Sequence, residues 1–528
     1  MKNPFEFHDK VVVRVPRMPF INQYTLDDVL DFYKTQDARE ALYVASPALY
    51  NKLLAYDEGN VTVKKDLDRL YSSLTRYYIR MHTRTTPFGL FAGVGTFDWD
   101  SQNSDSEIIL GDDLKRNTKF DMDFLCDLSD YIASIPFIRN QIKLHVNSSL
   151  STNKDEFRFI DYKRVSGRRK HQVSSLKYSE YIQKVIDCAD YNHNSLDIAQ
   201  ALVQLDDEIS PEEALQFIHA LIDMQLLCTE LEYSLTGKEY FYKICEIVES
   251  IEKDHPDIEK AKKFIVELKD AIDTLDNNTS NSIEDYKRIH NTINEIGITF
   301  KENTLFQIDM GLDLQSSKLD ISLQSDILKA IEYLNKFTPI NESEDLTEFK
   351  KKFNDRFENN EIPLLYLLDV DYGIGYGNDN QKDNNALTND LFFYGKEEDR
   401  IQKVEWSKML SWKIKILNDV INKGDFEIDL SKTKVPKKDI NWSNLPPSFS
   451  VMFRAVNNDD ILLDSVGNSS AVNLLARFAN ESNDLEDTLR EIADKEQELN
   501  PDVLFAEVVH LSDDRLGNIL RRPSFRKY

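Results

Sequence analysis

The chain has 528 residues, which predicts two to four folding units and excludes a single small binding module. Its content of 41% hydrophobic and 30% charged residues is typical of a globular protein and excludes a largely disordered chain. The net charge of -27 argues against nonspecific coating of nucleic acid by the whole surface, but it is compatible with a local basic surface.

The sequence contains no run of about eighteen apolar residues, and its N-terminus lacks an apolar signal-peptide core. It therefore predicts a cytoplasmic protein without a membrane span. The four cysteines show no CxxC spacing, and no two of the nine histidines show HxxxH spacing. We therefore expect neither structural disulfides nor a metal site, and no bound cofactor.

The N-terminal part predicts one strand followed by helices in which apolar residues recur every three or four positions. These elements are the strand Val11–Pro16 and the helices Leu26–Tyr33, Ala38–Ala45 and Lys64–Met81. After Gly93 the pattern changes to short apolar runs that are typical of strands. The expected strands are Ile108–Leu110, Ile142–Val146 and Phe157–Ile160, with a helix at Met122–Ile135.

Three short helices are predicted next. The first covers Tyr178–Cys188, the second is capped by Ser195 and ends at Leu205, and the third begins with Ser210 as the N-cap, Pro211 at the first position and Glu213. An alternating segment, CTELEYSLTGKEYFY, follows. The order indicates a winged-helix-like element, and an ordinary three-helix subdomain is the alternative.

The remaining sequence predicts further helices, several strands and one polar loop. The expected helices are Lys243–Asp273, Ile283–Ile296, Ser322–Leu334, Asp345–Phe357, Ala471–Phe478 and Leu485–Leu499. The expected strands are Leu305–Met310, SFSVMFRAV and VLFAEVVHL, and the expected loop is Gly377–Asp390.

The segment RMHTRTTPFGLFAGVG is the most unusual in the chain. If a helix continues through Arg80 and Arg84, their guanidinium groups project from one face, one turn apart. Two such cations bind an anion between them most favourably, because each offers a planar fork of donors to phosphate or carboxylate oxygens. Pro87 ends the helix, and the glycines that follow let backbone approach a ligand closely. An exposed arginine pair ahead of a buried turn is the alternative.

This segment resembles the signature of the class I lantibiotic dehydratases (LanB-type). Other stretches that resemble the family follow in the same order along almost the whole chain. They are VVVRVP, KFDMDFL, VNSSL, FQIDM, PLLYLLDVDYGIGYG, NSSAVNLLARF and AEVVHLSDDRLGNILRRP. The resemblance implies an aminoacyl-tRNA-dependent acyl transferase that glutamylates Ser and Thr of a ribosomally made precursor peptide in lanthipeptide (bacteriocin) biosynthesis, with glutamyl-tRNA as co-substrate.

The resemblance also assigns roles to individual residues. Arg80, Arg84 and Thr86 match the glutamylation motif and are expected to bind the aminoacyl end of the tRNA. Asp121 and Asp309 match less specific patterns, and a carboxylate there would orient the nucleophilic hydroxyl or bind the amino group of the glutamyl unit. A helix cap or a salt-bridge partner is the alternative for each.

His510 and Arg515 are two further candidates. A histidine can accept the hydroxyl proton, and an arginine can stabilise the oxyanion that forms during attack on the ester. A strand-end histidine bonded to backbone is the alternative. Arg14 matches a residue linked to elimination, but the rest of that second site normally lies in a separate C-terminal domain.

The resemblance makes the winged-helix-like element a recognition site for the precursor's leader. An extended leader would add a strand beside the third helix, with side-chain pockets between Tyr178 and Leu231 providing selectivity. Six nearby cations form the predicted tRNA-binding patch: Arg158, Lys163, Arg164, Arg168, Arg169 and Lys170. A solvated hairpin is the alternative for this patch.

These observations predict an α+β protein of several subdomains, with mixed sheets, helical layers and the embedded winged-helix-like element. The expected domains are an N-terminal α+β part at 1–160, the peptide-recognition element at 161–242 and the rest of the glutamylation region at 243–528. Since family members usually continue well past HLSDDRLGN, we expect a fragment or one part of a split enzyme.

The expected partners are a precursor peptide bound through its leader and glutamyl-tRNA, with a separate elimination domain or cyclase and a homodimer as further candidates. A peptide aminoacyl-tRNA ligase, which adds an amino acid to a peptide C-terminus, is one alternative function. A non-catalytic leader-binding component is another.

Overall fold

The computed structural model describes residues 3–527 apart from 101–105, 112–113, 153–154, 252–254, 316, 337–342, 359, 371, 378–405, 425, 430–432, 434–441, 443–444, 457–459 and 468. The chain divides into two compact units, Met1–Phe5 with Leu323–Pro446 and Glu6–Ser322 with Pro447–Tyr528. The predicted three-part division stays a prediction. Most of the predicted loop Gly377–Asp390 lies outside the described residues.

The unit that contains Leu323–Pro446 is helical in its described part. Its helices are α13 (Leu323–Asn335), α14 (Glu344–Phe357), α15 (Leu364–Leu368) and α16 (Lys408–Lys423). The prediction of helices at Ser322–Leu334 and Asp345–Phe357 is confirmed to within one residue at each end.

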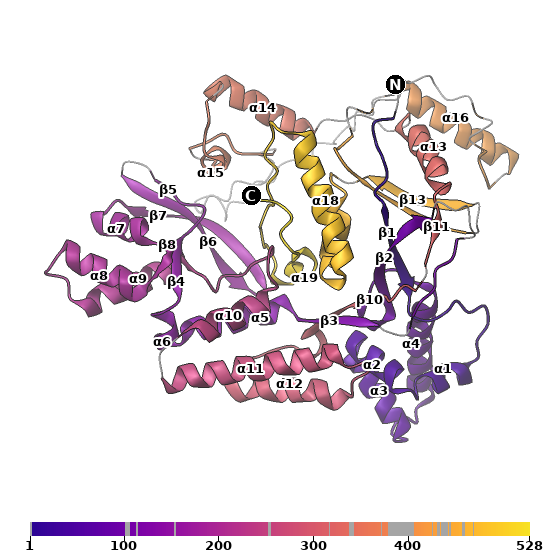
Figure 1. Ribbon diagram of the computed structural model, residues 1–528, viewed down its shortest axis with the longest axis horizontal. Helices are drawn as coiled ribbons and strands as arrows, with labels where there is room; N and C mark the ends of the chain where they lie inside the picture. The colour runs from indigo at the N-terminus through magenta and orange to yellow at the C-terminus, as the bar shows by residue number, and fades with distance from the viewer. Residues whose placement is uncertain are drawn as a thin grey trace, which may run out of the picture. The chain divides into compact units, whose positions relative to one another are not determined.

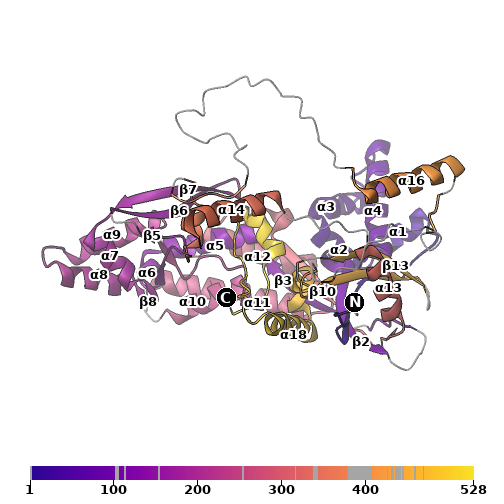
Figure 2. The same ribbon diagram turned by 90° about the horizontal axis from the view of Figure 1, so that it is seen from above.

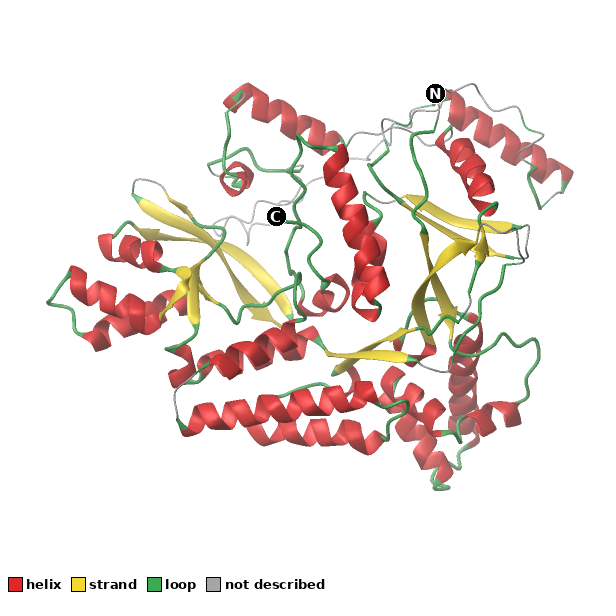
Figure 3. Cartoon of the chain, in the orientation of Figure 1, coloured by secondary structure: helices red, strands yellow, loops and turns green. Residues whose placement is uncertain are grey.

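The other unit is mixed, as Figure 3 shows by colour. Its first elements are β1 (Lys10–Pro16), α1 (Leu26–Phe32), α2 (Gln36–Ala45), α3 (Pro47–Asp57), α4 (Lys64–Thr83), β2 (Ala92–Asp100), β3 (Lys115–Phe120), α5 (Met122–Ser134) and α6 (Pro136–Arg139). Next come β4 (Lys143–Val146), β5 (Ser151–Thr152), β6 (Glu156–Val165), β7 (Arg168–Lys177), α7 (Glu180–Cys188), β8 (Asp190–Asn194), α8 (Ser195–Leu205), α9 (Pro211–Asp223) and β9 (Leu227–Thr229).

The unit continues with α10 (Tyr240–Ser250), α11 (Pro256–Asn277), α12 (Ile283–Ile296), β10 (Phe306–Gly311) and β11 (Leu319–Asp320). After the helical unit it resumes with β12 (Ser450–Ala455), β13 (Ile461–Gly467), α17 (Val472–Leu475), a 3-10 segment Ala476–Glu481, α18 (Asn483–Leu499), a 3-10 turn Asp514–Leu516 and α19 (Gly517–Leu520). None of the described helices is both long and apolar enough to cross a membrane.

A five-stranded sheet joins distant parts of this unit. Its order is β1-β2-β10-β3, with β11 paired to β2. β2 and β10 run parallel, whereas β1 with β2 and β10 with β3 are antiparallel. A Cβ on Gly93 would lie 2.6 Å from the Met310 carbonyl oxygen, so glycine is needed for the approach of these strands. The close approach predicted for this glycine is therefore to the protein's own backbone rather than to a ligand.

The largest hydrophobic core lies under α1–α5 and α10–α12 and includes the fully buried Phe91, Phe120 and Tyr286. A second core joins β6 to α7, α8 and α9, which are clustered beside the β6–β7 hairpin in both views (Figures 1 and 2). A third core lies between β2 and α18. The helices that form these cores thus bury one apolar face each, as their periodicity predicted.

Local signals gave most elements correctly. The prediction of Ser210 as N-cap and Pro211 at the first position of α9 is confirmed, and Glu213 completes the capping box. The cap of α8 is Asn194 rather than Ser195. Asn194 accepts hydrogen bonds from two backbone N–H groups, whereas Ser195 occupies the first turn.

Some predicted elements are wrong. The predicted helix Lys243–Asp273 is interrupted, because Pro256 starts α11 after α10 has ended at Ser250. Residues 503–511 form no strand, since no strand among the described residues pairs with them. Ile108–Leu110 contributes to isolated bridges only, and the alternating segment after Thr229 turns instead of extending β9.

Candidate functional site

The end of α4 presents the predicted arginine pair. The buried residues Leu70, Leu74, Tyr78 and Met81 fix the apolar face of this helix. The helix ends at Thr83, so Arg84 is its C-cap with an extended backbone, and the condition that the helix continues through both arginines is not met. The Arg84 N–H still donates to the Arg80 carbonyl oxygen at 3.1 Å, which places the two Cα atoms one turn apart.

Neither arginine is neutralised by a carboxylate within the part of the chain that the structure describes. The Arg80 guanidinium carbon lies 4.4 Å from the centre of the Phe88 ring, and its buried Nε has no hydrogen-bond partner among the described residues. Burial, and then the charge of Arg84, lowers the pKa of Arg80. Arg84 and Thr86 are exposed. The pair is therefore open to an anion.

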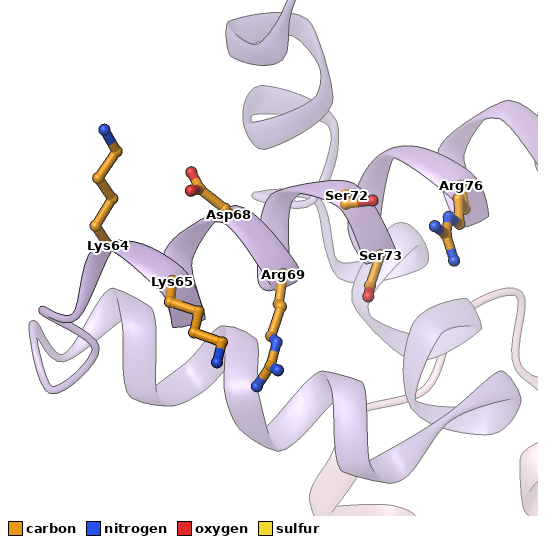
Figure 4. A pocket seen from close by; sticks show the side chains of 7 residues that line it. All are labelled: Lys64, Lys65, Asp68, Arg69, Ser72, Ser73 and Arg76. Atoms are coloured by element: carbon orange, nitrogen blue, oxygen red, sulfur yellow. The ribbon is translucent and has the colours of Figure 1, made fainter.

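More cations continue this face along α4. Lys65, Arg69, Arg76, Arg80 and Arg84 follow one another at intervals of four or seven residues, and we call them the α4 basic face. The spacing places the first four on one side of α4, and Arg84 follows as the C-cap of the helix. Figure 4 shows Lys65, Arg69 and Arg76 extending from the same side of α4, around a shallow depression. By helical rise the face is about 28 Å long.

The α4 basic face carries little compensating charge among the described residues. Asp66 lies 3.8 Å from Arg69 in a pair whose side chains are both more than half exposed, and Asp68 lines the same depression as Lys65, Arg69 and Arg76. The sequence motif indicated only Arg80 and Arg84 in this row. The spacing of Lys65, Arg69 and Arg76 was visible in the sequence and is the signal that could have revealed the rest.

Asp309 lies in a buried charge cluster. On β10 its Oδ2 is 3.5 Å from the Lys119 Nζ, and its Oδ1 accepts a hydrogen bond from Arg477 at 3.2 Å. Lys119 also lies 3.4 Å from Glu481, and burial raises the pKa of the Glu481 carboxyl to about 7. The Arg477 side chain is 30% exposed, so it connects the buried Asp309 to the surface.

Asp121 caps α5 and binds the C-terminal segment. Its Oδ1 accepts the Asp123 N–H at 2.9 Å, and its Oδ2 accepts the Asn518 side-chain N–H at 2.8 Å. Arg515 lies 3.6 Å from the same Oδ2 with its side chain 55% exposed. Burial raises the pKa of Asp121. The structure thus brings Asp121 and Arg515 together, and the cap and salt-bridge roles of Asp121 and Asp309 are both present.

The remaining candidates lie elsewhere in the fold. His510 is exposed, and its ring centre lies 5.2 Å from that of His171. Arg14, on β1, is half-buried and donates to the Met452 sulfur at 3.7 Å. Burial lowers the pKa of Arg14. Among the described residues, neither side chain forms a hydrogen bond or an ion pair with Arg80, Arg84 or Arg515.

The predicted basic patch is not a single exposed surface. Arg164 lies among four carboxylates, with nitrogen–oxygen distances of 2.8 Å to Asp514, 2.8 Å to Asp127, 2.9 Å to Asp130 and 3.6 Å to Asp123. Its donors are therefore directed to the protein and are not available for tRNA phosphates.

Arg169 is also internal. It is 6% exposed, lies between the rings of Tyr162 and Tyr233, and pairs with the fully buried Asp514 at 2.8 Å. We therefore correct the prediction for Arg164 and Arg169, because both are neutralised by internal acids. Lys163 and Lys170 lie opposite each other on β6 and β7 and are exposed, as is Arg168, whereas Arg158 is half-buried.

The unit Glu6–Ser322 with Pro447–Tyr528 is therefore an α+β unit with a mixed sheet. It carries an arginine pair without an acidic partner among the described residues, and a buried charge cluster. The chain belongs to the family described as "Lantibiotic dehydratase, N terminus", which it matches over residues 34–528. This finding confirms the sequence resemblance.

Curated relatives and solved structures agree with this assignment. The chain is 24% identical to the nisin biosynthesis protein NisB of Lactococcus lactis subsp. lactis over 92% of its own length and 48% of that protein. It is 22% identical to the subtilin biosynthesis protein SpaB of Bacillus subtilis, over 100% of the chain and 51% of SpaB. The chain thus spans about half the length of these relatives.

Two solved structures share the fold. The tRNA-dependent lantibiotic dehydratase MibB from Microbispora sp. 107891 superposes with a TM-score of 0.78 at 19% identity, over 98% of this chain and 50% of MibB. The glutamylation domain of TbtB from thiomuracin biosynthesis gives a TM-score of 0.53 at 14% identity, over 92% and 57% of the two chains. The mixed helices and sheets match the MibB fold.

Proposed function

We propose that this chain carries out the tRNA-dependent glutamylation of Ser and Thr side chains in a precursor peptide, the first half of dehydration in lanthipeptide biosynthesis. The observation that carries the proposal is the open pair Arg80 and Arg84 at the end of the α4 basic face. Family membership supports it, as do the descriptions of MibB as tRNA dependent and of the TbtB domain as a glutamylation domain.

The proposed reaction is an acyl transfer. The peptide hydroxyl oxygen attacks the ester carbonyl carbon of glutamyl-tRNA, the bond from that carbon to the ribose oxygen breaks, and the hydroxyl proton ends on the ribose oxygen. The products are a glutamyl ester on Ser or Thr and free tRNA. Negative charge develops on the carbonyl oxygen during attack, so a guanidinium held nearby stabilises the transition state.

Arg80, Arg84 and Thr86 are the proposed holders of the acylated tRNA end. Planar guanidinium groups match phosphate and carboxylate oxygens, and the Thr86 hydroxyl adds one donor. The stacking of Arg80 on Phe88 orients one of the two forks. The rest of the α4 basic face would bind successive phosphates of the acceptor stem, which a cationic surface does without base specificity.

Asp121 with Arg515, and Asp309 with Arg477, are the proposed carboxylates near the reacting groups. Each acid is buried and paired with a partly exposed arginine. A substrate ammonium or hydroxyl can compete for such a carboxylate at the surface end of the pair. His510 stays a candidate base, and its exposure leaves it free to approach a peptide hydroxyl.

The peptide side of the proposal rests on α8 and α9, in the segment that the sequence predicts to be a winged-helix-like element. A groove of about 380 Å³ runs between these helices, and its apolar lining suits leader side chains. It is lined by Leu196, Ala199, Gln200, Val203, Pro211, Glu212 and Leu215. The edges of the small sheet β8-β4-β9 offer backbone groups for an added strand.

The test is to incubate the chain with a precursor peptide, tRNA, synthetase and glutamate. A second incubation uses a version of the chain extended to the length of its curated relatives. Mass spectrometry should show a glutamyl adduct on Ser or Thr, and Arg84→Ala should lower its formation about 100-fold or more, as for loss of an oxyanion donor. Arg288→Ala is the matched control, because Arg288 is 78% exposed on α12 and its ion pair among the described residues is with Asp285.

Three outcomes contradict the proposal. An amide-linked residue at the peptide C-terminus would indicate the ligase alternative. Leader binding without any mass change, in both proteins, would indicate the non-catalytic alternative. Full activity of Arg84→Ala would remove the arginine pair from the mechanism.

A further inference from the structure

Three side chains of metal-binding types meet in the small sheet, away from the residues discussed above. His145 on β4 lies directly opposite Cys228 on β9 in the antiparallel register. Glu232 follows in the turn after β9, where its N–H donates to the Thr229 carbonyl oxygen at 2.9 Å. One imidazole nitrogen, the Cys228 sulfur and one Glu232 carboxylate oxygen all lie within 4.8 Å of one another.

The protein alone satisfies these polar groups poorly. The His145 side chain is only 13% exposed, and its buried Nδ1 has no hydrogen-bond partner in the described part of the chain. Its Nε2 lies 3.6 Å from Glu232, which is longer than a hydrogen bond. Neither ring nitrogen of His145 thus has a hydrogen-bond partner among the described residues, and a cation would provide a partner for one of them.

The thiol and the carboxylate disfavour each other's charged forms. Burial, and then the charge of Glu232, raises the pKa of Cys228 well above its usual range. A divalent cation between the two groups reverses this relation, because it attracts both the thiolate and the carboxylate and displaces the thiol proton.

Tyr191 fixes the orientation of the imidazole. Its ring is stacked on His145 with a centroid distance of 4.1 Å and an angle of 9° between the planes. Tyr191 has φ +68°, a left-handed conformation that is unfavourable for a bulky aromatic residue. Backbone strain of this kind is concentrated at ligand sites, where the surrounding structure holds it.

We propose that His145, Cys228 and Glu232 bind one Zn²⁺ ion, with water as the fourth ligand. Zinc accepts nitrogen, sulfur and oxygen together, whereas Ca²⁺ and Mg²⁺ require oxygen ligands. Zinc ligands at about 2.0–2.3 Å from the ion lie roughly 3.3–3.7 Å apart in a tetrahedron, so the three side chains need to shift by about 1 Å. The ion would join β4 to the turn after β9.

This site reverses the expectation from the sequence. The chain has no CxxC or HxxxH spacing, and the ligands come from two segments, His145 on β4 and the pair Cys228 and Glu232, which the sheet brings together. None of the ligands belongs to the α4 basic face or to the carboxylate pairs, although β4 and β9 are part of the sheet proposed to receive the leader.

Metal analysis of the whole chain, purified without a histidine tag, tests the site. After chelator treatment and addition of ZnCl₂, the dialysed protein should retain one zinc per chain. With CoCl₂ it should show a thiolate-to-cobalt charge-transfer band. Cys228→Ser and His145→Ala should lower the affinity by more than about 100-fold, the upper range for loss of a supporting residue. Cys188→Ser is the matched control, because Cys188 is also free and of intermediate burial.

The proposal is overturned if the wild-type chain retains no zinc and shows no charge-transfer band. It is also overturned if Cys228→Ser retains as much zinc as wild type, or if Cys188→Ser loses the ion. Circular dichroism of each variant checks folding. If Cys228→Ser does not fold, Glu232→Gln decides the matter, since it keeps the size of the side chain and should still weaken cobalt binding about tenfold or more.

Discussion

Arginines have different partners in two regions of this chain. In the β6–β7 hairpin, Arg164 and Arg169 are surrounded by carboxylates and aromatic rings of the protein itself. At the end of α4, Arg80 and Arg84 have no acidic partner among the described residues. The sequence shows clustered cations in both regions. The number of cations in a segment therefore does not show whether an arginine is structural or available to a ligand. The presence or absence of an acidic partner in the fold does show it.

Loss of Arg169 should have the largest effect on stability. Arg169→Ala leaves the fully buried Asp514 without one of its two arginine partners, and breaking a buried ion pair costs about 3–5 kcal/mol of unfolding free energy. Arg168→Ala, beside it in sequence but 79% exposed, should change stability by less than about 0.5 kcal/mol. Equilibrium denaturation by urea measures both. Equal effects of the two variants would contradict the greater importance of the buried ion pair over the exposed pair of Arg168 with Asp513.

The buried cluster around Lys119 should make stability depend on pH. Burial raises the pKa of Glu481 to about 7 from an ordinary 4.5, so between these values the folded protein holds a proton that the unfolded chain releases. Stability should therefore fall as the pH rises from about 5 to 7, by less than about 1.4 kcal/mol per pH unit for this group.

Glu481→Gln should make this decline shallower without abolishing it. Burial also raises the pKa of Asp276 to about 6, so that group contributes in the same direction. Urea titrations at several pH values measure the slope. An unchanged slope in Glu481→Gln would show that Lys119 keeps the Glu481 carboxylate charged in the fold.

The smallest expected effect is on the salt dependence of tRNA binding. Arg69→Ala and Arg76→Ala each remove one phosphate-binding cation, so each should reduce the slope of log affinity against log salt by about 1, with little effect on stability. Arg288→Ala should leave the slope unchanged. Fluorescence titrations with labelled tRNA at a series of salt concentrations measure this, and identical slopes in all variants would exclude the α4 basic face as a phosphate-binding surface.

Much of the fold followed from local sequence signals. The cap of α9 and the helices α4, α5 and α18 depend on residues within a few positions of one another, so the sequence contains the whole signal. The predicted strand at 503–511 shows the limit. Its alternation gives strand propensity, but a strand also needs a neighbour, which the pattern cannot supply.

Some residues of the candidate site could be predicted from local sequence spacing, and others could not. The spacing of Arg80 and Arg84 identified the open pair, because the two residues lie within five positions at the end of one helix. The pairing of Arg169 with Asp514 joins residues 345 positions apart, and Lys119 with Glu481 joins residues 362 positions apart. No local sequence pattern indicates such distant pairings. The sequence alone therefore predicted Arg169 to be on the surface and did not identify Lys119, Arg477 or Glu481.

The proposed function depends most on Arg80 and Arg84 holding the acylated end of a tRNA. The sharpest experiment compares the affinity of two acceptor-stem RNAs, one ending in a stable amide-linked glutamate and one uncharged, for the wild-type chain and for Arg84→Ala. We expect wild type to prefer the acylated RNA and Arg84→Ala to lose this preference while retaining salt-dependent binding of both. An undiminished preference in Arg84→Ala would refute this role of the pair.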